Sequence, residues 1–323
     1  RSDYFTSRNP NIVYSRAEIL EKIILPTKGY IKYIYEQNTY RKQTEDWPNT
    51  VTTNSTNKTS SGVRVKNIEN YDLNDVLIKK KNYHYNVDYL NNGTSVSSGV
   101  LSWIPIYYEQ YSGDVKDLMR SDSRNKYTYA GATYKKWSTN SVNPRYYYHG
   151  SHLTYSEVTE EETNSGNTIN NGYTVYKFSN YDNGYLNKPV VNQIMDDKNV
   201  SSEWKSDEEN SMDQERGKIL EQAIYNSQKT IVSKTTNQYN DDPDRFDEHV
   251  KLLELFANPV YSLYTPSLRY VAYLIYTYHP FLKSKTVVNY DALGNTLTEK
   301  YSYTYNQHRQ LTSTEFTNSF GEK

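Results

Sequence analysis

Tyrosine recurs at alternate positions in several segments of the chain, and this periodicity is the strongest constraint on its fold. Residues 83–89 read YHYNVDY, so three tyrosines and a valine alternate with His, Asn and Asp. Residues 31–35 and 301–305 alternate in the same way. Successive side chains of a β-strand lie on opposite faces, so each segment can bury one face and leave the other in water. The alternation therefore predicts β-strands.

Clusters of Asn, Gly, Ser and Asp separate these segments. They occupy residues 90–99, 163–172, 180–184 and 291–295. Glycine and asparagine tolerate the positive φ angles that tight hairpin turns require. The pattern predicts strands joined by hairpins, in an elongated antiparallel meander that is mainly β.

The composition excludes several classes of protein. Hydrophobic residues make up only 35% of the 323 residues, but 36 tyrosines supply apolar area and favour strands. The net charge of -1 argues against a nucleic-acid partner, and the basic run at 78–81 is interpreted as a solvated strand face. No apolar stretch approaches the length of a transmembrane helix, and Arg1 opens the chain without a secretion-signal pattern. The chain has no cysteine, which excludes a disulfide framework.

One segment carries the signals of a prominent α-helix, at about 243–257. Asp242 can cap it, Pro243 suits its first position, and apolar residues recur on one face as far as Ala257. Two polar segments, 47–62 and 195–217, are expected to be long loops. The second is taken as a linker between a β-rich domain at 1–194, with Tyr-rich hairpins, and a β segment at 218–323 that contains the helix.

A degenerate repeat runs through the chain. Each copy has a tyrosine, an Asp or Asn, a polar or Gly-containing turn, and an aliphatic residue five to seven positions after the tyrosine. This order predicts a strand, an Asx-type turn and a second strand. The repeat-turn residues are Tyr71, Asp72, Tyr181, Asp182, Tyr225, Asn226, Tyr290, Asp291, Gly294, Tyr305 and Asn306.

These copies resemble the YD (Rhs-type) repeats of large bacterial cell-surface and toxin-associated proteins. Further motifs stand in the same order as in uncharacterised surface proteins of Gram-negative bacteria: LPTKGYIKYIYEQNTY (25–40), GVRVKNIENYD (62–72), HGSHLTYSEVTEEE (149–162), NGYTVYKFSN (171–180) and RGKILEQAIYN (216–226). The resemblance implies an Rhs-like β-sheet assembly, secreted or on the outer cell surface. It implies no catalytic residues, because the toxic activities of that family lie in separate terminal domains.

The residues themselves suggest little catalytic chemistry. His149 and His152 are three residues apart but flank a Gly-Ser turn, and the acidic residues near 241–248 are explained by helix capping. Glu160–Glu162 is interpreted as a solvated strand edge, since neighbouring carboxylates on a strand diverge. We therefore assign no catalytic, cofactor-binding or metal-binding residue and expect no cofactor.

Consecutive aromatic residues form a candidate binding surface. Stacked rings on a surface suit sugars or protein partners. The candidate residues are Trp103, Tyr107, Tyr108, Tyr146, Tyr147 and Tyr148.

The sequence thus favours a non-catalytic structural or interaction segment of a large cell-surface or secreted protein. Its expected partners are other segments of that protein or another protein subunit. The alternatives are a carbohydrate-binding module that binds glycans through the aromatic clusters, and a hydrolase whose site is not recognised.

Overall fold

A computed structural model of the chain describes residues 9–45, 50–102, 108–116, 129–137, 152–164, 170–188, 210–258 and 267–322. The fold is mainly β, as the alternation predicts. Thirteen strands form one sheet, in the order β17-β16-β15-β12-β11-β10-β9-β4-β3-β2-β5-β8, with β1 also paired to β2. All neighbours are antiparallel except β2 and β5. Two further hairpins, β6–β7 and β13–β14, complete the described strands.

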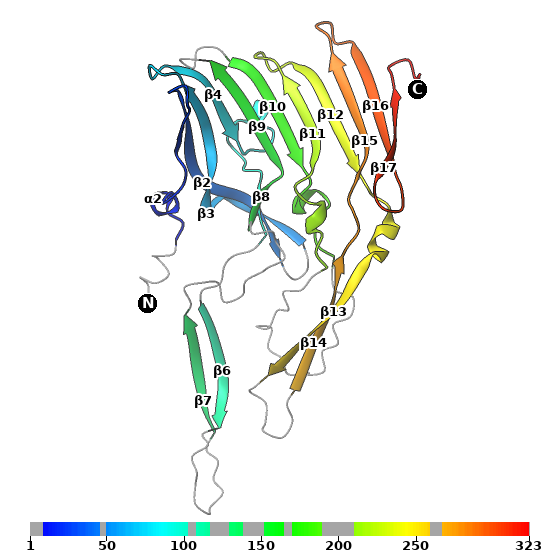
Figure 1. Ribbon diagram of the computed structural model, residues 1–323. Helices are drawn as coiled ribbons and strands as arrows, with labels where there is room; N and C mark the ends of the chain where they lie inside the picture. Colours follow the sequence, from blue (N-terminus) through cyan, green and yellow to red (C-terminus); the bar gives the residue numbers. More distant parts are fainter. Residues whose placement is uncertain are drawn as a thin grey trace, which may run out of the picture.

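The sheet is broad and curved, and no second described sheet lies over it (Figure 1). Its first strands are β1 (Lys22–Ile24), β2 (Tyr30–Glu45), β3 (Thr50–Tyr71), β4 (Leu77–His84), β5 (Gly99–Leu101), β8 (Leu153–Tyr155) and β9 (Glu157–Asn164). Its later strands are β10 (Asn170–Phe178), β11 (Ile219–Tyr225), β12 (Ile231–Tyr239), β15 (Leu282–Tyr290), β16 (Thr296–Tyr305) and β17 (Leu311–Thr317). The separate hairpins are β6 (Tyr108–Lys116) with β7 (Tyr129–Trp137), and β13 (His249–Asn258) with β14 (Ser267–Tyr276).

Helices are short. The described ones are α2 (Ile12–Ser15), α3 (Tyr89–Asn92) and the 3₁₀ turns η2 (Tyr181–Asn183), η3 (Asp213–Glu215) and η4 (Pro243–Asp247). The prediction of a prominent helix at 243–257 is wrong. Asp242 does cap the start, by accepting the Asp244 N–H at 3.1 Å, but the helical turn ends at Asp247. The next ten residues after Glu248 pair along their whole length with β14, so cross-strand pairing overrides a helical pattern that is only local.

The sheet continues across the expected boundary between domains. Strands β10 and β11 lie on either side of residues 195–217, and they pair with each other from Tyr173↔Tyr225 to Phe178↔Ile219. Within that segment, Asn210, Met212 and Glu215 are buried, while residues 195–209 lie outside the described residues. The other polar segment, expected as a loop at 47–62, contributes residues 50–62 to β3, where β2 supplies the hydrogen-bonding partner.

Cross-strand ion pairs connect the central strands. Lys79 and Lys81 of β4 bind Glu162 and Glu160 of β9, at 2.5 and 2.6 Å, and Lys80 binds Glu69 of β3 at 3.4 Å. The run of lysines and the run of glutamates are therefore paired central strands, not the solvated face and edge expected from each run alone. Opposite charges placed across two strands stabilise and specify the pairing.

Five turns share one hydrogen-bonding arrangement. Its first residue, Asp or Asn, accepts the N–H groups two and four residues further on, and its own N–H donates to the carbonyl four residues on. The residue three positions on has a positive φ of 61 to 85°. These turns are 72–76, 226–230, 291–295, 306–310 and 318–322. The side chain of the first residue thus acts as the template of the turn.

Acid is expected to weaken the turn at 291–295. Hydrogen bonds from the Asn295 side chain and backbone lower the pKa of Asp291, so the carboxylate stabilises the turn above its ordinary pKa of about 4 and this contribution is lost as pH falls through the lower, folded-state pKa. Hydrogen exchange should show the Asn295 amide losing protection in acid. The matching Thr230 amide, held by the neutral Asn226, should not, and Asp291→Asn should remove the acid response. Equal acid responses at both turns would contradict this account.

The two ends of the sheet differ. Turns 25–29, 72–76, 226–230 and 291–295 lie at one end, as the registers Tyr30↔Tyr71, Tyr173↔Tyr225 and Asn289↔Ser233 require. The opposite end receives the connections β4–β5, β10–β11 and β12–β15, and the β6–β7 and β13–β14 hairpins lie beyond it (Figure 1). We call this the insertion end.

Three small groups of buried apolar side chains form the core. The first contains Tyr40, Leu101 and Leu153, the second Val100 and Tyr181, and the third Met212, Tyr276 and Tyr278. All three include residues from the connections at the insertion end or from the strands next to them. Most of the buried apolar side chains in the described part of the chain therefore lie at the insertion end, while Val175 and Ala223 are buried opposite each other on β10 and β11.

Candidate functional site at the insertion end

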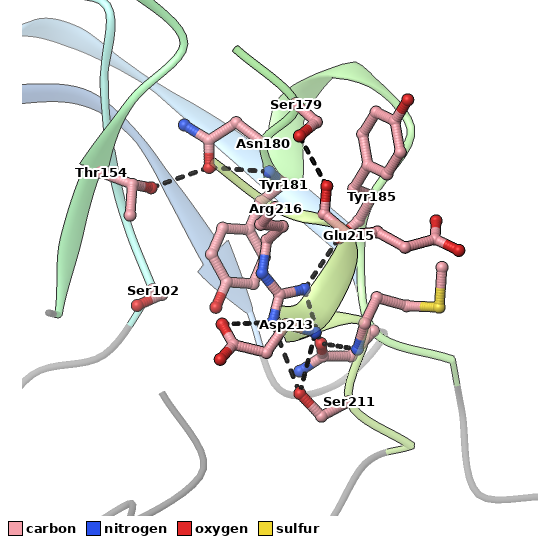
Figure 2. Close-up of polar contacts among 12 residues, drawn as sticks. Ser102, Thr154, Ser179, Asn180, Tyr181, Tyr185, Ser211, Asp213, Glu215 and Arg216 are labelled. Atoms are coloured by element: carbon pink, nitrogen blue, oxygen red, sulfur yellow. Dashed lines mark hydrogen bonds and ion pairs between the residues drawn. The ribbon is translucent and has the colours of Figure 1, made fainter. Parts of the chain in front are cut away.

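Arg216 lies at the centre of a buried polar cluster (Figure 2). We call this cluster the junction; it combines residues of the β10–β11 connection with residues at the base of the β13–β14 hairpin. The Arg216 side chain is 4% exposed, and one guanidinium nitrogen donates at 2.8 Å both to the Tyr185 carbonyl and to the Asn187 side chain. The other terminal nitrogen lies 3.4 Å from Asp213. The guanidinium carbon lies 3.9 Å from the centre of the Tyr181 ring. A planar cation with several donors suits such a site, because it satisfies carbonyl, carboxylate and ring together.

The start of this connection is fixed to the N-terminal half of the sheet. Asn180, only 1% exposed, caps η2 and accepts a hydrogen bond of 2.7 Å from Thr154 of β8. Asp182 binds Lys42 of β2 at 2.7 Å. The Asn180–Asn183 capping pair sets this geometry locally, since each side chain bonds to the other's backbone N–H.

The end of the connection is fixed to the base of the β13–β14 hairpin. Buried Glu215 accepts hydrogen bonds from Tyr278 at 2.5 Å and from Arg245 at 2.7 Å. Tyr278 follows β14 and Arg245 precedes β13, so the Glu215 carboxylate binds the chain on both sides of the hairpin. Buried Asn210 adds a third contact, accepting the Leu274 N–H at 2.8 Å.

The electrostatics of this group favour a structural role. Burial and the hydrogen bond to Glu215 raise the pKa of the Tyr278 phenol, so it keeps its proton at neutral pH. Arg245 is permanently charged, and the carboxylate oxygen of Glu215 nearest to both partners already accepts two hydrogen bonds. A phenol, a carboxylate and a guanidinium bonded to one another in a buried cluster can orient chain segments but offer no base or nucleophile to a substrate. Within the described ranges, no group of three His, Cys, Asp or Glu side chains is placed to hold a metal ion.

The structure places the predicted repeat residues in two kinds of position. Tyr71, Asp72, Tyr225, Asn226, Tyr290, Asp291, Gly294, Tyr305 and Asn306 belong to the shared turns or to the tyrosines directly before them. Tyr181 and Asp182 do not form that turn, because they lie in η2 and contact Arg216 and Lys42 at the junction.

Most of the candidate aromatic surface lies outside the described residues. This holds for Trp103, Tyr107, Tyr146, Tyr147 and Tyr148, while Tyr108 is the first residue of β6. Among the histidines considered, His149 is also outside, and the His152 ring lies within 3.1 Å of the Ser60 and Ser61 hydroxyls.

The junction was not predicted from the sequence. Its members come from residues 179–187, 210–216 and 245–278, and no local period links them. One signal was available, since the Asn180–Asn183 spacing before Gly184 is typical of a capped turn.

Comparisons with known proteins returned no relationship: no family model, curated protein or solved structure matches the chain. No helix in the described segments is long and apolar enough to cross a membrane.

Proposed function

We propose that this chain is a non-catalytic structural and interaction segment of a large bacterial cell-surface or secreted protein of the Rhs/YD-repeat type. One observation carries most of the proposal: strands of the sheet are joined by tight turns at one end, and at the other end a buried polar junction holds the base of the β13–β14 hairpin. Rigid sheets that present long connections at one end are suited to recognition. The repeated Asx turns support the relation to YD-type repeats.

The partner is proposed to be another segment of the same protein or another subunit. Strand β17 supports this, because β16 is its one partner in the described sheet and most of its side chains are exposed. Unlike many natural edges, residues 311–317 contain no lysine and no proline, so little in that strand opposes the addition of another strand.

Surface labelling of the source bacterium tests the proposal. Antibodies against the folded chain should stain intact cells or detect the protein in the medium, and external protease should remove the cell-bound signal. A cytoplasmic protein should serve as the control for cell integrity. Signal only after lysis would overturn the proposed location, and saturable binding on a glycan array would favour the carbohydrate-binding alternative.

A further inference from the structure

Tyr30 and Tyr71 form a parallel stacked pair at the turn end of the sheet. They are directly opposed residues of β2 and β3, their ring centres are 4.6 Å apart, and the ring planes differ by 15°. Gly29 makes this approach possible, because a Cβ there would lie 2.7 Å from the Tyr71 carbonyl oxygen. Both tyrosines are half-buried, so each ring keeps contact with solvent.

Each phenol of this pair also has a carboxylate beside it. Tyr71 donates to Glu69 Oε2 at 2.8 Å, and this bond, with burial, raises the pKa of Tyr71 to about 12. Burial and a hydrogen bond with Asp75 raise the pKa of Tyr30. Oxidation of a phenol by one electron makes it strongly acidic, and a carboxylate already within hydrogen-bonding distance can take the proton as the electron leaves. Both members of the stack are thus arranged for proton-coupled oxidation.

Two other aromatic pairs in the described part of the chain each lack one part of this arrangement. Tyr85 and Tyr155 are 4.7 Å apart, but their hydroxyls donate to the Val65 carbonyl and the Asn38 side chain, which are neutral. The Arg64 guanidinium also donates to the Tyr155 hydroxyl at 2.9 Å, and a cation bound at that oxygen disfavours loss of an electron from the phenol. A cation over the ring face does not distinguish the two pairs, because Lys22 Nζ lies 3.6 Å from the centre of the Tyr30 ring and Arg64 lies 4.4 and 5.1 Å from the other two rings.

Tyr301 shows what is missing when the neighbouring ring is not a tyrosine. Tyr301 repeats the Glu–x–Tyr arrangement, with its hydroxyl 3.1 Å from Glu299, but the ring beside it is Phe316. Phenylalanine has no phenol to oxidise, so this site can form a radical but no tyrosine–tyrosine bond.

We propose that Tyr30 and Tyr71 form a site of dityrosine crosslinking by one-electron oxidants, such as a metal-centred or photochemically generated oxidant. Each phenol loses one electron to the oxidant and one proton to its carboxylate. The two radicals join through the ring carbons beside their oxygens, and each of these carbons then passes its hydrogen, as a proton, to its own oxygen. The product has lost two electrons and two protons in total. The new bond joins β2 to β3 where both strands meet the turn end of the sheet.

The crosslink would give a cysteine-free chain a covalent link between strands. Disulfides commonly fill this role in secreted proteins. The inference does not rest on the proposed function, since it depends only on the two rings and their proton acceptors.

The test is photo-oxidation of the dilute, full-length chain with tris(bipyridine)ruthenium(II) and persulfate. Peptide mass spectrometry should find residues 30 and 71 joined with the loss of two hydrogen atoms, in a yield at least an order of magnitude above that of the Tyr85–Tyr155 pair. Blue dityrosine fluorescence should rise in parallel while the protein stays monomeric. Free tyrosine oxidised under the same conditions confirms that the oxidant is active.

Four variants locate the reaction. Tyr30→Phe and Tyr71→Phe keep a stacked ring and should each abolish the product, whereas Tyr301→Phe should leave its yield unchanged. Glu69→Gln should lower the yield severalfold, because it removes the proton acceptor of Tyr71. Circular dichroism checks that each variant is folded. The proposal is overturned if the chain forms no crosslink between residues 30 and 71 while free tyrosine couples, or if Tyr85 and Tyr155 couple equally well.

Discussion

Replacement of Arg216 by methionine is expected to lower the free energy of unfolding by about 3 kcal/mol, because it removes one partner from a buried, hydrogen-bonded charge cluster. Methionine fills much of the same volume and can still contact the Tyr181 ring. It cannot donate to the Tyr185 carbonyl or to Asn187, and it leaves Asp213 without the guanidinium. Urea denaturation, followed by circular dichroism, measures the change.

Arg16→Met is the matched control. Arg16 also pairs with a carboxylate, Glu21 at 2.6 Å, but both side chains are about half exposed. Exposed ion pairs contribute less than about 1 kcal/mol, so this variant should unfold near the parent midpoint. If the two substitutions lower the free energy of unfolding equally, the junction does not stabilise this end of the sheet.

Gly99→Ala should also lower the free energy of unfolding by about 3 kcal/mol, because the added methyl group overpacks the site. A Cβ at residue 99 would lie 2.2 Å from the Thr39 carbonyl oxygen and 3.0 Å from the Tyr40 Cα. Both contacts are to the backbone of β2, so the strand itself has to move. That movement would disturb the parallel pairing of β5 with β2 and the burial of Val100 and Leu101.

Gly294→Ala separates this packing effect from the loss of a glycine. Gly294 has a φ of 85°, and a Cβ added there would meet no atom within 4 Å. Asp75, Lys229 and Arg309 hold positive φ angles at the equivalent positions of other turns, so alanine should cost only the left-handed backbone strain of about 1 kcal/mol. Thermal and urea unfolding of both variants give the comparison. A loss of stability at residue 99 no greater than at residue 294 would show that β5 does not lie against β2 as described.

Local chemistry made part of the fold predictable. The strands at 31–35, 83–84 and 301–305 follow from alternation, and the Asx turns follow from an Asp or Asn whose side chain bonds its own backbone. The lysine and glutamate runs held more information than either gave alone. Read as antiparallel strands, they place Lys81 opposite Glu162 and bring Lys79 and Lys81 to diagonal positions beside Glu162 and Glu160, a charge complementarity that favours the β4–β9 pairing.

The remaining features depend on distant partners. The sequence of β13 alone predicts a helix, and residues 50–62 of β3 alone predict a polar loop. Both segments are strands because they pair with β14 and β2, respectively. Tyr181 and Asp182 match the repeat in sequence, but the Asn180–Asn183 cap and Lys42 draw them into the junction. Charged groups such as Arg216 are recognised as buried only once three separate segments come together.

The pairing of β12 with β15 tests the central claim, which is one sheet with the β13–β14 hairpin inserted at its end. Ser233 and Asn289 are directly opposed across these strands, and their side chains are hydrogen-bonded at 2.8 Å. Cysteines at directly opposed antiparallel positions lie within the distance that a disulfide needs. Because the chain has no other cysteine, Ser233→Cys with Asn289→Cys should form one intramolecular disulfide under mild oxidation, detected by peptide mass spectrometry. Ser233→Cys with Val288→Cys places the thiols on opposite faces and should not. A disulfide in the second variant, or none in the first, would contradict the sheet described here.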